Sequence, residues 1–445
     1  MTSQQHARLG DEVLAGRALP AWHGRYGDRV TDEIEILTAD SEPDRLSRFH
    51  EATRIGFSLS QSSDEQTEHF VADARADRAR LRQVADPEAP GQVPVATLVD
   101  LDGSINAGAE ILPATLITDV TVRPDHRRRG LMRRLMAQAL GEARDRGTPV
   151  ALLTATEATI YARFGFGVAT LVNDVEVTAT ERFRIHPEAL AGHGRVRMVS
   201  PDQAVDLIEA AFARFHTVQR GSVVRPHFYR NVLTGRFDWD RNTPVSSLRT
   251  VLHHGPDGEV DGWACYVPRT DCFPHRVQVT DLGALSAQAH LGLWDFLGSL
   301  DLVGRVTHSG ARLDDPLPWA LADRRCYRVA GTSDRIWARV LDPVRCLAAR
   351  PWHRDGTTVL QITDPLGLAA QTLRVEVRAG QVSVTATTDE PQVQIAAAAL
   401  AGLWLGTASV AQLAGAGQVV GSPAALAAFT ELTELADPPY ANTFF

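Results

Sequence analysis

A short basic turn is the segment of this 445-residue chain whose residue types most clearly suggest chemistry. Three consecutive arginines, Arg127 to Arg129, precede Gly130. The turn leads into a predicted amphipathic helix, where free backbone N–H groups and the helix dipole attract anions, and glycine lets a bulky anion come close to the backbone. The pattern therefore predicts a pyrophosphate site, to which the arginines add positive charge. The helix is predicted from an apolar residue at every fourth position: Leu131, Leu135, Ala139 and Ala143.

An extended stretch ends directly before this turn. Val120 and Val122 alternate with polar neighbours and predict a strand, whose backbone edge could pair with an amide-bearing arm. Coenzyme A offers both a pyrophosphate and a pantetheine arm with two amides. A solvated arginine run at a helix start is the alternative explanation of the arginines alone, but the strand and helix on either side favour the anion site.

The composition excludes several classes of function. All 45 basic residues are arginine, so there is no lysine to form a Schiff base with pyridoxal phosphate or to act in a P-loop. The formal net charge of −9 argues against a nucleic-acid footprint and fits a cationic partner. The four cysteines lack metal-ligand spacing, so no metal is expected. Because there is neither an apolar signal segment nor a membrane-length apolar run, the sequence predicts a cytoplasmic protein.

The elements around the turn must position it, and they predict an α/β unit over residues 31–178. The charged stretch 65–84 has helical spacing, and a helix is expected over 131–146. Strands are expected at 34–37, 93–101, 116–122, 150–155 and 171–178.

Residues 179–325 repeat this plan in degraded form. Thr118-Asp119-Val120 is echoed by Thr280-Asp281-Leu282, and a helix and a further strand follow each copy. The second copy has no glycine-arginine turn. Chance similarity between two buried strands is the alternative explanation of so short an echo.

The pattern changes from about Arg335. Alternating apolar positions predict strands at 336–340, 359–362, 373–377 and 382–387, and alanine-rich helices are expected at 395–405 and 423–435. This succession is typical of an α+β domain with an antiparallel sheet. The chain finishes with Phe444 and Phe445, which predict an end that is packed against the protein.

The motifs together resemble a known family. The GNAT acetyltransferases bind coenzyme A through the pattern R/Q-x-x-G-x-G/A, which Arg127 and Gly130 match; Met132 departs from it, because most members have a small residue there. One branch, the enhanced intracellular survival (Eis) family of aminoglycoside N-acetyltransferases, is similar in more detail. The similar segments are His126–Leu131, Glu157–Tyr161, Arg163–Gly167 and the aromatic C-terminus.

This resemblance implies an α+β fold class, with two GNAT-like mixed-sheet domains followed by a sterol-carrier-protein-like α+β domain. The expected limits are a polar N-terminal extension at 1–30, the catalytic GNAT domain at 31–178, a second, degenerate GNAT-like domain at 179–325, and the sterol-carrier-protein-like domain at 326–445.

The resemblance also implies roles for individual residues. Acetyl-CoA would be held on the backbone of Val120, Thr121 and Val122 and along Thr156 and Glu157. Tyr161 would be the general acid and the carboxylate of Phe445 the general base. The pyrophosphate loop would consist of Arg128, Arg129, Gly130, Leu131, Met132 and Arg133, with Arg127 beside it.

The implied function is transfer of acetyl from acetyl-CoA to primary amines of cationic small molecules, aminoglycosides foremost. Direct attack in a ternary complex is expected, because no cysteine lies near the motif to form an acyl-enzyme. The family assembles as hexamers, so a homo-oligomer is expected. The alternatives are a lysine or polyamine acetyltransferase, and a non-enzymatic lipid or sterol carrier with a relic GNAT domain. The intact arginine-glycine turn argues against the carrier.

Overall fold

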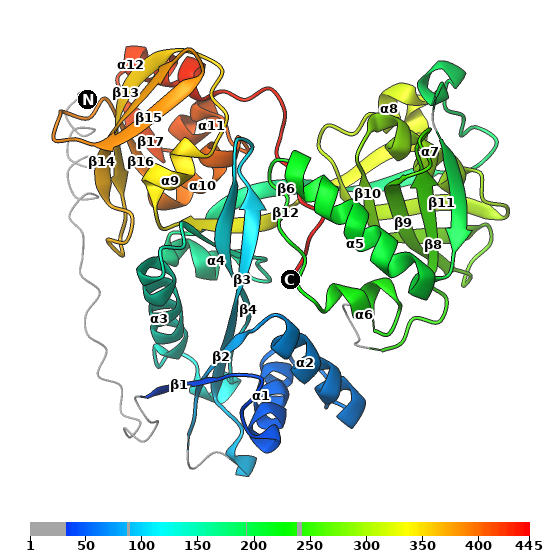
Figure 1. Ribbon diagram of the computed structural model, residues 1–445, viewed down its shortest axis with the longest axis horizontal. Helices are drawn as coiled ribbons and strands as arrows, with labels where there is room; N and C mark the ends of the chain where they lie inside the picture. Colours follow the sequence, from blue (N-terminus) through cyan, green and yellow to red (C-terminus); the bar gives the residue numbers. More distant parts are fainter. Residues whose placement is uncertain (1–32, 87–89, 193, 238–242) are drawn as a thin grey trace, which may run out of the picture.

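The strands form two β-sheets, and the strands of the larger sheet come from more than half the length of the chain (Figure 1). The computed structural model describes residues 33–86, 90–192, 194–237 and 243–445. The expected extension at 1–30 lies outside these residues. No helix in the described part of the chain combines the length and the hydropathy needed to cross a membrane.

The first unit contains the basic turn. Helix α3 lies on one side of its strands and α1 and α2 lie on the other (Figure 1). The expected helix over 65–84 is wrong in its second half, because the chain turns at Asp77 and residues 80–84 form a strand between two neighbours. The elements are β1 (Ile34–Leu37), α1 (Pro43–Gly56), α2 (Asp64–Ala76), β2 (Arg80–Val84), β3 (Ala96–Asn106), β4 (Ile111–Val122), α3 (Leu131–Asp145), β5 (Val150–Leu153) and α4 (Ala158–Tyr161).

The second unit has the same succession of antiparallel strands, a helix and a parallel strand. Strand β10 is followed by α7 and then by β11, which pairs in parallel with β10. The repeated order matches that of β4, α3 and β5. The elements are β7 (Arg195–Val199), α5 (Pro201–Val218), α6 (Tyr229–Leu233), β8 (Arg249–His254), β9 (Val260–Arg269), β10 (His275–Ala284), α7 (Ala287–Gly298), β11 (Val303–Ala311) and α8 (Leu317–Ala320).

Two long strands, β6 (Gly167–Thr178) and β12 (Tyr327–Val340), join the units into one twelve-stranded sheet. Strand β6 follows the first unit in sequence but pairs with β11 of the second, and β12 follows the second unit but pairs with β5 of the first. The two strands also pair with each other. The strand expected at 336–340 is therefore part of this sheet and does not belong to the sheet of the last domain.

The third unit is a five-stranded sheet covered by helices. Its sheet is mixed, which corrects the antiparallel expectation, because β13 and β16 run parallel. The helix expected at 395–405 begins at Ala397, after two residues of that stretch have completed β16. The elements are α9 (Pro343–Ala348), β13 (Gly356–Thr363), β14 (Gln371–Arg378), β15 (Gln381–Ala386), β16 (Val393–Ala396), α10 (Ala397–Leu405), α11 (Val410–Gly415), β17 (Val419–Gly421) and α12 (Pro423–Thr433).

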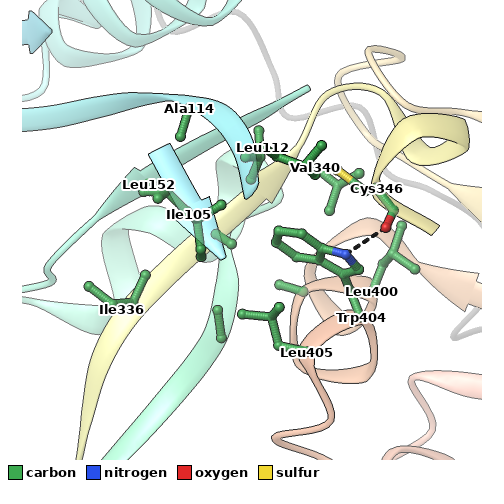
Figure 2. Close-up of a cluster of buried hydrophobic side chains, with 14 of the residues drawn as sticks. Ile105, Leu112, Ala114, Leu152, Ile336, Val340, Cys346, Leu400, Trp404 and Leu405 are labelled. Carbon is green, nitrogen blue, oxygen red and sulfur yellow. Dashed lines mark hydrogen bonds between the residues drawn. The ribbon is translucent and has the colours of Figure 1, made fainter. Parts of the chain in front are cut away.

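The third unit shares its hydrophobic core with the first. Side chains of β3, β4, β5 and β12 meet those of α9 and α10 in one cluster (Figure 2). Trp404 of α10 is fully buried there, and its indole N–H donates a hydrogen bond of 2.7 Å to the Cys346 carbonyl of α9. Trp404 is thus a core residue, and the third unit is packed tightly against the sheet.

Candidate active site

Strands β4 and β5 part in the middle of the first unit. They pair in parallel only from Ala114 to Leu116 of β4, opposite Val150 to Leu152 of β5. Beyond this point β4 continues to Val122 beside β3 alone, and no described residue forms a strand ladder along its other edge. The predicted backbone edge at Val120 and Val122 therefore exists and opens into the gap between the two strands.

A bulge interrupts β4 at Asp119. Its φ of +51° lies in the left-handed region, which a residue with a side chain rarely adopts. The Thr97 hydroxyl of β3 donates a 2.9 Å hydrogen bond to the Asp119 carbonyl and lies 2.7 Å from the Thr121 hydroxyl. These contacts hold the strand in its bulged shape at the gap.

The carboxylate of Asp119 has an unusual environment. It is partly buried, and no described residue gives it a hydrogen bond or an ion pair. Burial raises its pKa to about 6 because the charged form loses solvation. An unpaired carboxylate beside the gap attracts a cation. In the sequence, Asp119 stands out only as part of the Thr-Asp pair that recurs at Thr280-Asp281, and this pattern assigns it no role.

The amino end of α3 is open to a ligand. Gly130 is its N-cap with a φ of +78°, and no side chain caps the first turn of this helix. A Cβ added at Gly130 would have only the Arg133 guanidinium within 4 Å, at 3.9 Å. The first backbone N–H groups of α3 are therefore accessible, as an anion site requires.

Charge gathers around this helix end. Arg127, Arg128, Arg129 and Arg133 are exposed, and none of them forms an ion pair with another described residue. Met132, which departs from the family pattern, is half-buried and packs against the hydrophobic cluster that includes the buried face of α3. Its side chain therefore extends the core of the first unit.

His126 anchors the turn, a role that was not predicted from the sequence. It is buried, with its Nε2 atom 2.9 Å from Asp86 and its Nδ1 atom 2.9 Å from Asp125. Arg123 pairs with the same Asp125 at 2.7 Å and holds the pKa of that carboxyl well below its usual range. The position of a polar histidine directly before the arginines was the only signal for it.

The other wall of the gap starts at the carboxyl end of β5. Thr156 and Glu157 lie exposed in the segment between β5 and α4, and Glu157 is the N-cap of α4. Tyr161 ends α4, is 6% exposed, and packs edge-on against Phe166. Burial, with a smaller contribution from Glu157, raises the pKa of the Tyr161 phenol. The hydroxyl therefore stays protonated at neutral pH.

The last residue of the chain reaches the same end of β5. Phe445 is 8% exposed and Phe444 37%, so the expectation of a packed terminus is confirmed for the last residue and wrong for the one before it. The Thr154 hydroxyl, one position beyond β5, donates a hydrogen bond to a carboxylate oxygen of Phe445. The structure thus gathers the residues implied by the resemblance around one gap: the β4 edge, the turn and α3 on one side, and Thr156, Glu157, Tyr161 and Phe445 at the end of β5.

Comparison with family models agrees with this architecture. Models of an acetyltransferase (GNAT) domain match residues 45–169 and 221–345, and a model of a sterol carrier protein domain matches residues 343–442. The expected succession of two GNAT domains and a sterol-carrier-like domain is confirmed.

Similar proteins have acetyltransferase names. An uncharacterised N-acetyltransferase of Streptomyces avermitilis is 34% identical over 323 residues, covering 70% of this chain and 76% of that protein. The N-acetyltransferase Eis of Mycobacterium tuberculosis is 32% identical over 348 residues, covering 76% and 82%. The crystal structure of Eis1 from Mycobacterium abscessus superposes with a TM-score of 0.77 at 25% identity, over 93% of this chain and all of that chain.

Proposed function

This chain belongs to the Eis family of GNAT N-acetyltransferases, and from that premise we propose that it transfers acetyl from acetyl-CoA to primary amines of cationic small molecules, aminoglycosides foremost. That the chain is an acetyl-transferring enzyme follows from its family. The acceptor class and the roles of the individual residues are the proposal.

One observation carries the proposed donor site: an uncapped helix end with an accessible backbone lies directly after an unpaired strand edge. The first N–H groups of α3 would bind the pyrophosphate, and the exposed arginines would add attraction. The backbone of Val120, Thr121 and Val122 would hydrogen-bond the amides of the pantetheine arm. Acetyl-CoA supplies the acetyl group as a reactive thioester at the tip of that arm.

The acceptor is proposed from charge. Asp119 presents a carboxylate without a partner beside the gap, and the chain has a net charge of −9. A primary ammonium group would satisfy Asp119 and lower its pKa through the opposite charge. Aminoglycosides have several such groups on a polar scaffold, so one ammonium can be bound while another amine reacts.

The proposed chemistry uses two groups at the end of β5. The Phe445 carboxylate would accept a proton from the acceptor ammonium, directly or through a water molecule, and the free amine would attack the thioester carbon. The C–N bond forms, the C–S bond breaks, and the Tyr161 hydroxyl would give its proton to the departing thiolate. The nitrogen loses its second proton as the amide forms, and this proton would return to the Tyr161 phenolate, directly or through water. A tyrosine has a reference pKa of ~10 and is a weaker acid than a thiol at ~8.5, and burial raises the pKa of Tyr161 further, so the transfer to the thiolate is uphill.

A thiol-release assay tests the proposal. The assay uses acetyl-CoA with aminoglycosides, polyamines and lysine peptides as separate acceptors, and the largest kcat/KM is expected for an aminoglycoside. Tyr161→Phe and deletion of Phe445 are each expected to lower kcat by about 100-fold while the KM for acetyl-CoA stays constant. Tyr266→Phe, which removes a buried tyrosine hydroxyl of β9 in the second unit, is the matched control. Wild-type rates in the first two variants would refute the assigned acid and base.

The oligomeric state is a separate part of the proposal. The family resemblance implies a homohexamer, and sedimentation velocity of the purified chain measures the mass directly. A monomer at micromolar concentration would contradict it.

A further inference from the structure

The second unit has a gap of its own, at the place that corresponds to the proposed donor site. Strands β10 and β11 pair in parallel up to Val279 and His308 and then part, as β4 and β5 part after Leu116 and Leu152. Strand β10 continues to Ala284 beside β9, and β11 continues to Ala311 beside β6. In the first unit, the corresponding gap is where the donor's arm is proposed to lie.

The C-terminal tail, which we define as residues 440–445, enters this second gap. Figure 1 shows the red end of the chain leaving α12 and returning to the middle of the molecule, between the first and second units. The Tyr440 hydroxyl donates a 2.8 Å hydrogen bond to the Gly310 carbonyl of β11. The Asn442 amide donates one of 3.0 Å to the Leu282 carbonyl of β10. The tail therefore binds one backbone carbonyl on each of the two parted strands.

Further contacts hold the rest of the tail. Tyr440 and Thr443 are almost completely buried, and the Thr443 hydroxyl donates a 2.6 Å hydrogen bond to the Val223 carbonyl. The Phe444 backbone N–H donates one of 2.6 Å to the Tyr229 hydroxyl of α6. The tail lines both cavities that remain beside the gap, of about 330 and 270 Å³. It thus occupies the gap in a single path that leads to Phe445.

The helix end beside this gap lacks the features of a donor site. The first turn of α7 is capped by its own Ser286 side chain, which accepts a hydrogen bond from the Ala289 backbone N–H at 3.1 Å. In α3, by contrast, the N-cap is a glycine and the first turn has no side-chain cap. Asp281, which follows the bulge at Thr280, is neutralised by Arg225 at 2.6 Å and accepts a hydrogen bond from the Trp263 indole at 2.8 Å. Neither an accessible helix end nor an unpaired carboxylate is offered here.

From these contacts we infer that the second GNAT domain serves as a clamp for the C-terminal tail: the tail takes the place that the acyl donor's arm takes in the first domain, and Tyr440 and Asn442 are positioning residues for Phe445. The domain therefore binds no second acyl-CoA at this gap. The catalytic consequence rests on the proposed function of Phe445, but the clamp itself does not.

Digestion with carboxypeptidase A tests the clamp without reference to catalysis. The enzyme removes a terminal phenylalanine only when the tail has left its place, so the rate of Phe445 release, followed by mass spectrometry, reports the released population. Tyr440→Phe and Asn442→Ala each remove one hydrogen bond to a parted strand and are expected to speed release about fivefold, and the double variant by about 25-fold. Tyr266→Phe removes a buried tyrosine hydroxyl of β9 in the same domain, which has no contact with residues 440–445 in the described part of the chain, and it is expected to release Phe445 at the wild-type rate.

The outcomes separate the two proposals. Faster release in the tail variants, with the control unchanged, supports the clamp; equal release in wild type and tail variants, or equally faster release in the control, overturns it. If release rises and kcat falls in parallel at constant KM for acetyl-CoA, the positioning role is supported as well. If release rises while kcat and its pH profile stay at wild-type values, the clamp stands and the proposed role of Phe445 fails.

Calorimetry with acetyl-CoA provides a second test. One binding site per chain is expected, and its Kd should rise by at least about 10-fold in Gly130→Val. Two binding sites per chain would mean that the second gap also binds acetyl-CoA, and this result would overturn the clamp. No binding at all would instead refute the proposed donor site at α3.

Discussion

The Thr154 hydroxyl donates a hydrogen bond to a carboxylate oxygen of Phe445, although 291 positions separate the two residues in sequence. Thr154 follows β5 directly, and four residues later α4 begins and leads to Tyr161. The contact therefore fixes the end of the chain beside the helix that carries the proposed general acid. Its consequence is that Thr154, a residue without a role in the sequence analysis, should matter for the rate.

Thr154→Val keeps the shape of the side chain and removes the hydrogen bond to Phe445. A hydrogen bond to a charged group contributes roughly 1.5–3 kcal/mol, so kcat is expected to fall by about 10-fold or more while the KM for acetyl-CoA stays constant. Steady-state kinetics measures both values. Thr159→Val, at an exposed position of α4, is the control and should behave as wild type. A Thr154→Val enzyme with unchanged kcat would contradict the proposed role of the carboxylate.

Gly130→Val should weaken donor binding. Valine in the left-handed region costs roughly 1–2 kcal/mol, and its side chain would cover the accessible face of the turn. The Kd for coenzyme A, measured by calorimetry, is expected to rise by at least about 10-fold. Gly147→Val is the matched control, because Gly147 has a φ of +76° and open space around its Cβ position at the other end of α3. If both variants bind coenzyme A equally well, the α3 site is wrong.

Asp119→Asn should change stability in a pH-dependent way. The pKa of Asp119 is about 6 in the folded protein and ~3.9 in an unfolded chain, so its protonated form favours folding. This contribution is complete below pH ~4 and is lost as the pH rises through 6. Asparagine does not ionise, so the variant should be more stable than wild type at pH 8, by about 1–2 kcal/mol, and equally stable near pH 4. Thermal unfolding at both pH values measures this.

The same substitution in the second domain should act in the opposite direction. Asp281→Asn leaves Arg225 buried without its charged partner and is expected to destabilise the protein by about 3 kcal/mol.

For Asp119→Asn, the KM for an aminoglycoside should also rise about 10-fold, because an ammonium loses its charged partner. If the melting temperature of Asp119→Asn at pH 8 equals that of wild type, the Asp119 carboxylate is solvated and is not a site for an ammonium group.

Gly167→Ala should loosen the docking of the third unit. A Cβ at Gly167 of β6 would lie 1.8 Å from the Ala398 carbonyl of α10, a backbone atom that cannot move alone. The expected loss is about 3 kcal/mol, seen as a fall of several degrees in the melting temperature. Gly141→Ala is the control: Gly141 lies inside α3 with nothing within 4 Å of its Cβ position, so alanine should stabilise by about 0.5–1 kcal/mol. A normal melting temperature for Gly167→Ala would contradict the close contact.

Local patterns were sufficient for the elements that carry the donor site. The four-residue apolar period predicted α3 from Leu131, and all four stripe residues are buried. The arginine-glycine turn marked the helix start, because N-caps and apolar periodicity are properties of neighbouring residues. The strand at 34–37 was predicted for the same reason.

Other features depended on contacts that are distant in sequence. Residues 80–84 have helical charge spacing but form β2, because β1 and β3 lie on either side and buried Arg82 finds Asp100 at 2.5 Å. The pairing of β6 with the second unit and of β12 with the first unit also could not be predicted from the sequence. An alternating strand has the same pattern whichever neighbour it pairs with.

The sequence by itself determined the family, the succession of domains, and the identity of the turn, since each is written in types and spacings of nearby residues. Only the tertiary structure decided that Asp119 is unpaired while Asp281, in the second copy of the Thr-Asp pair, is neutralised by Arg225. It also decided that the tail passes through the gap of the second domain and ends beside the first. The physical reason is that charge pairing, burial and backbone hydrogen bonds between distant segments depend on which surfaces meet in space, and no local pattern records that.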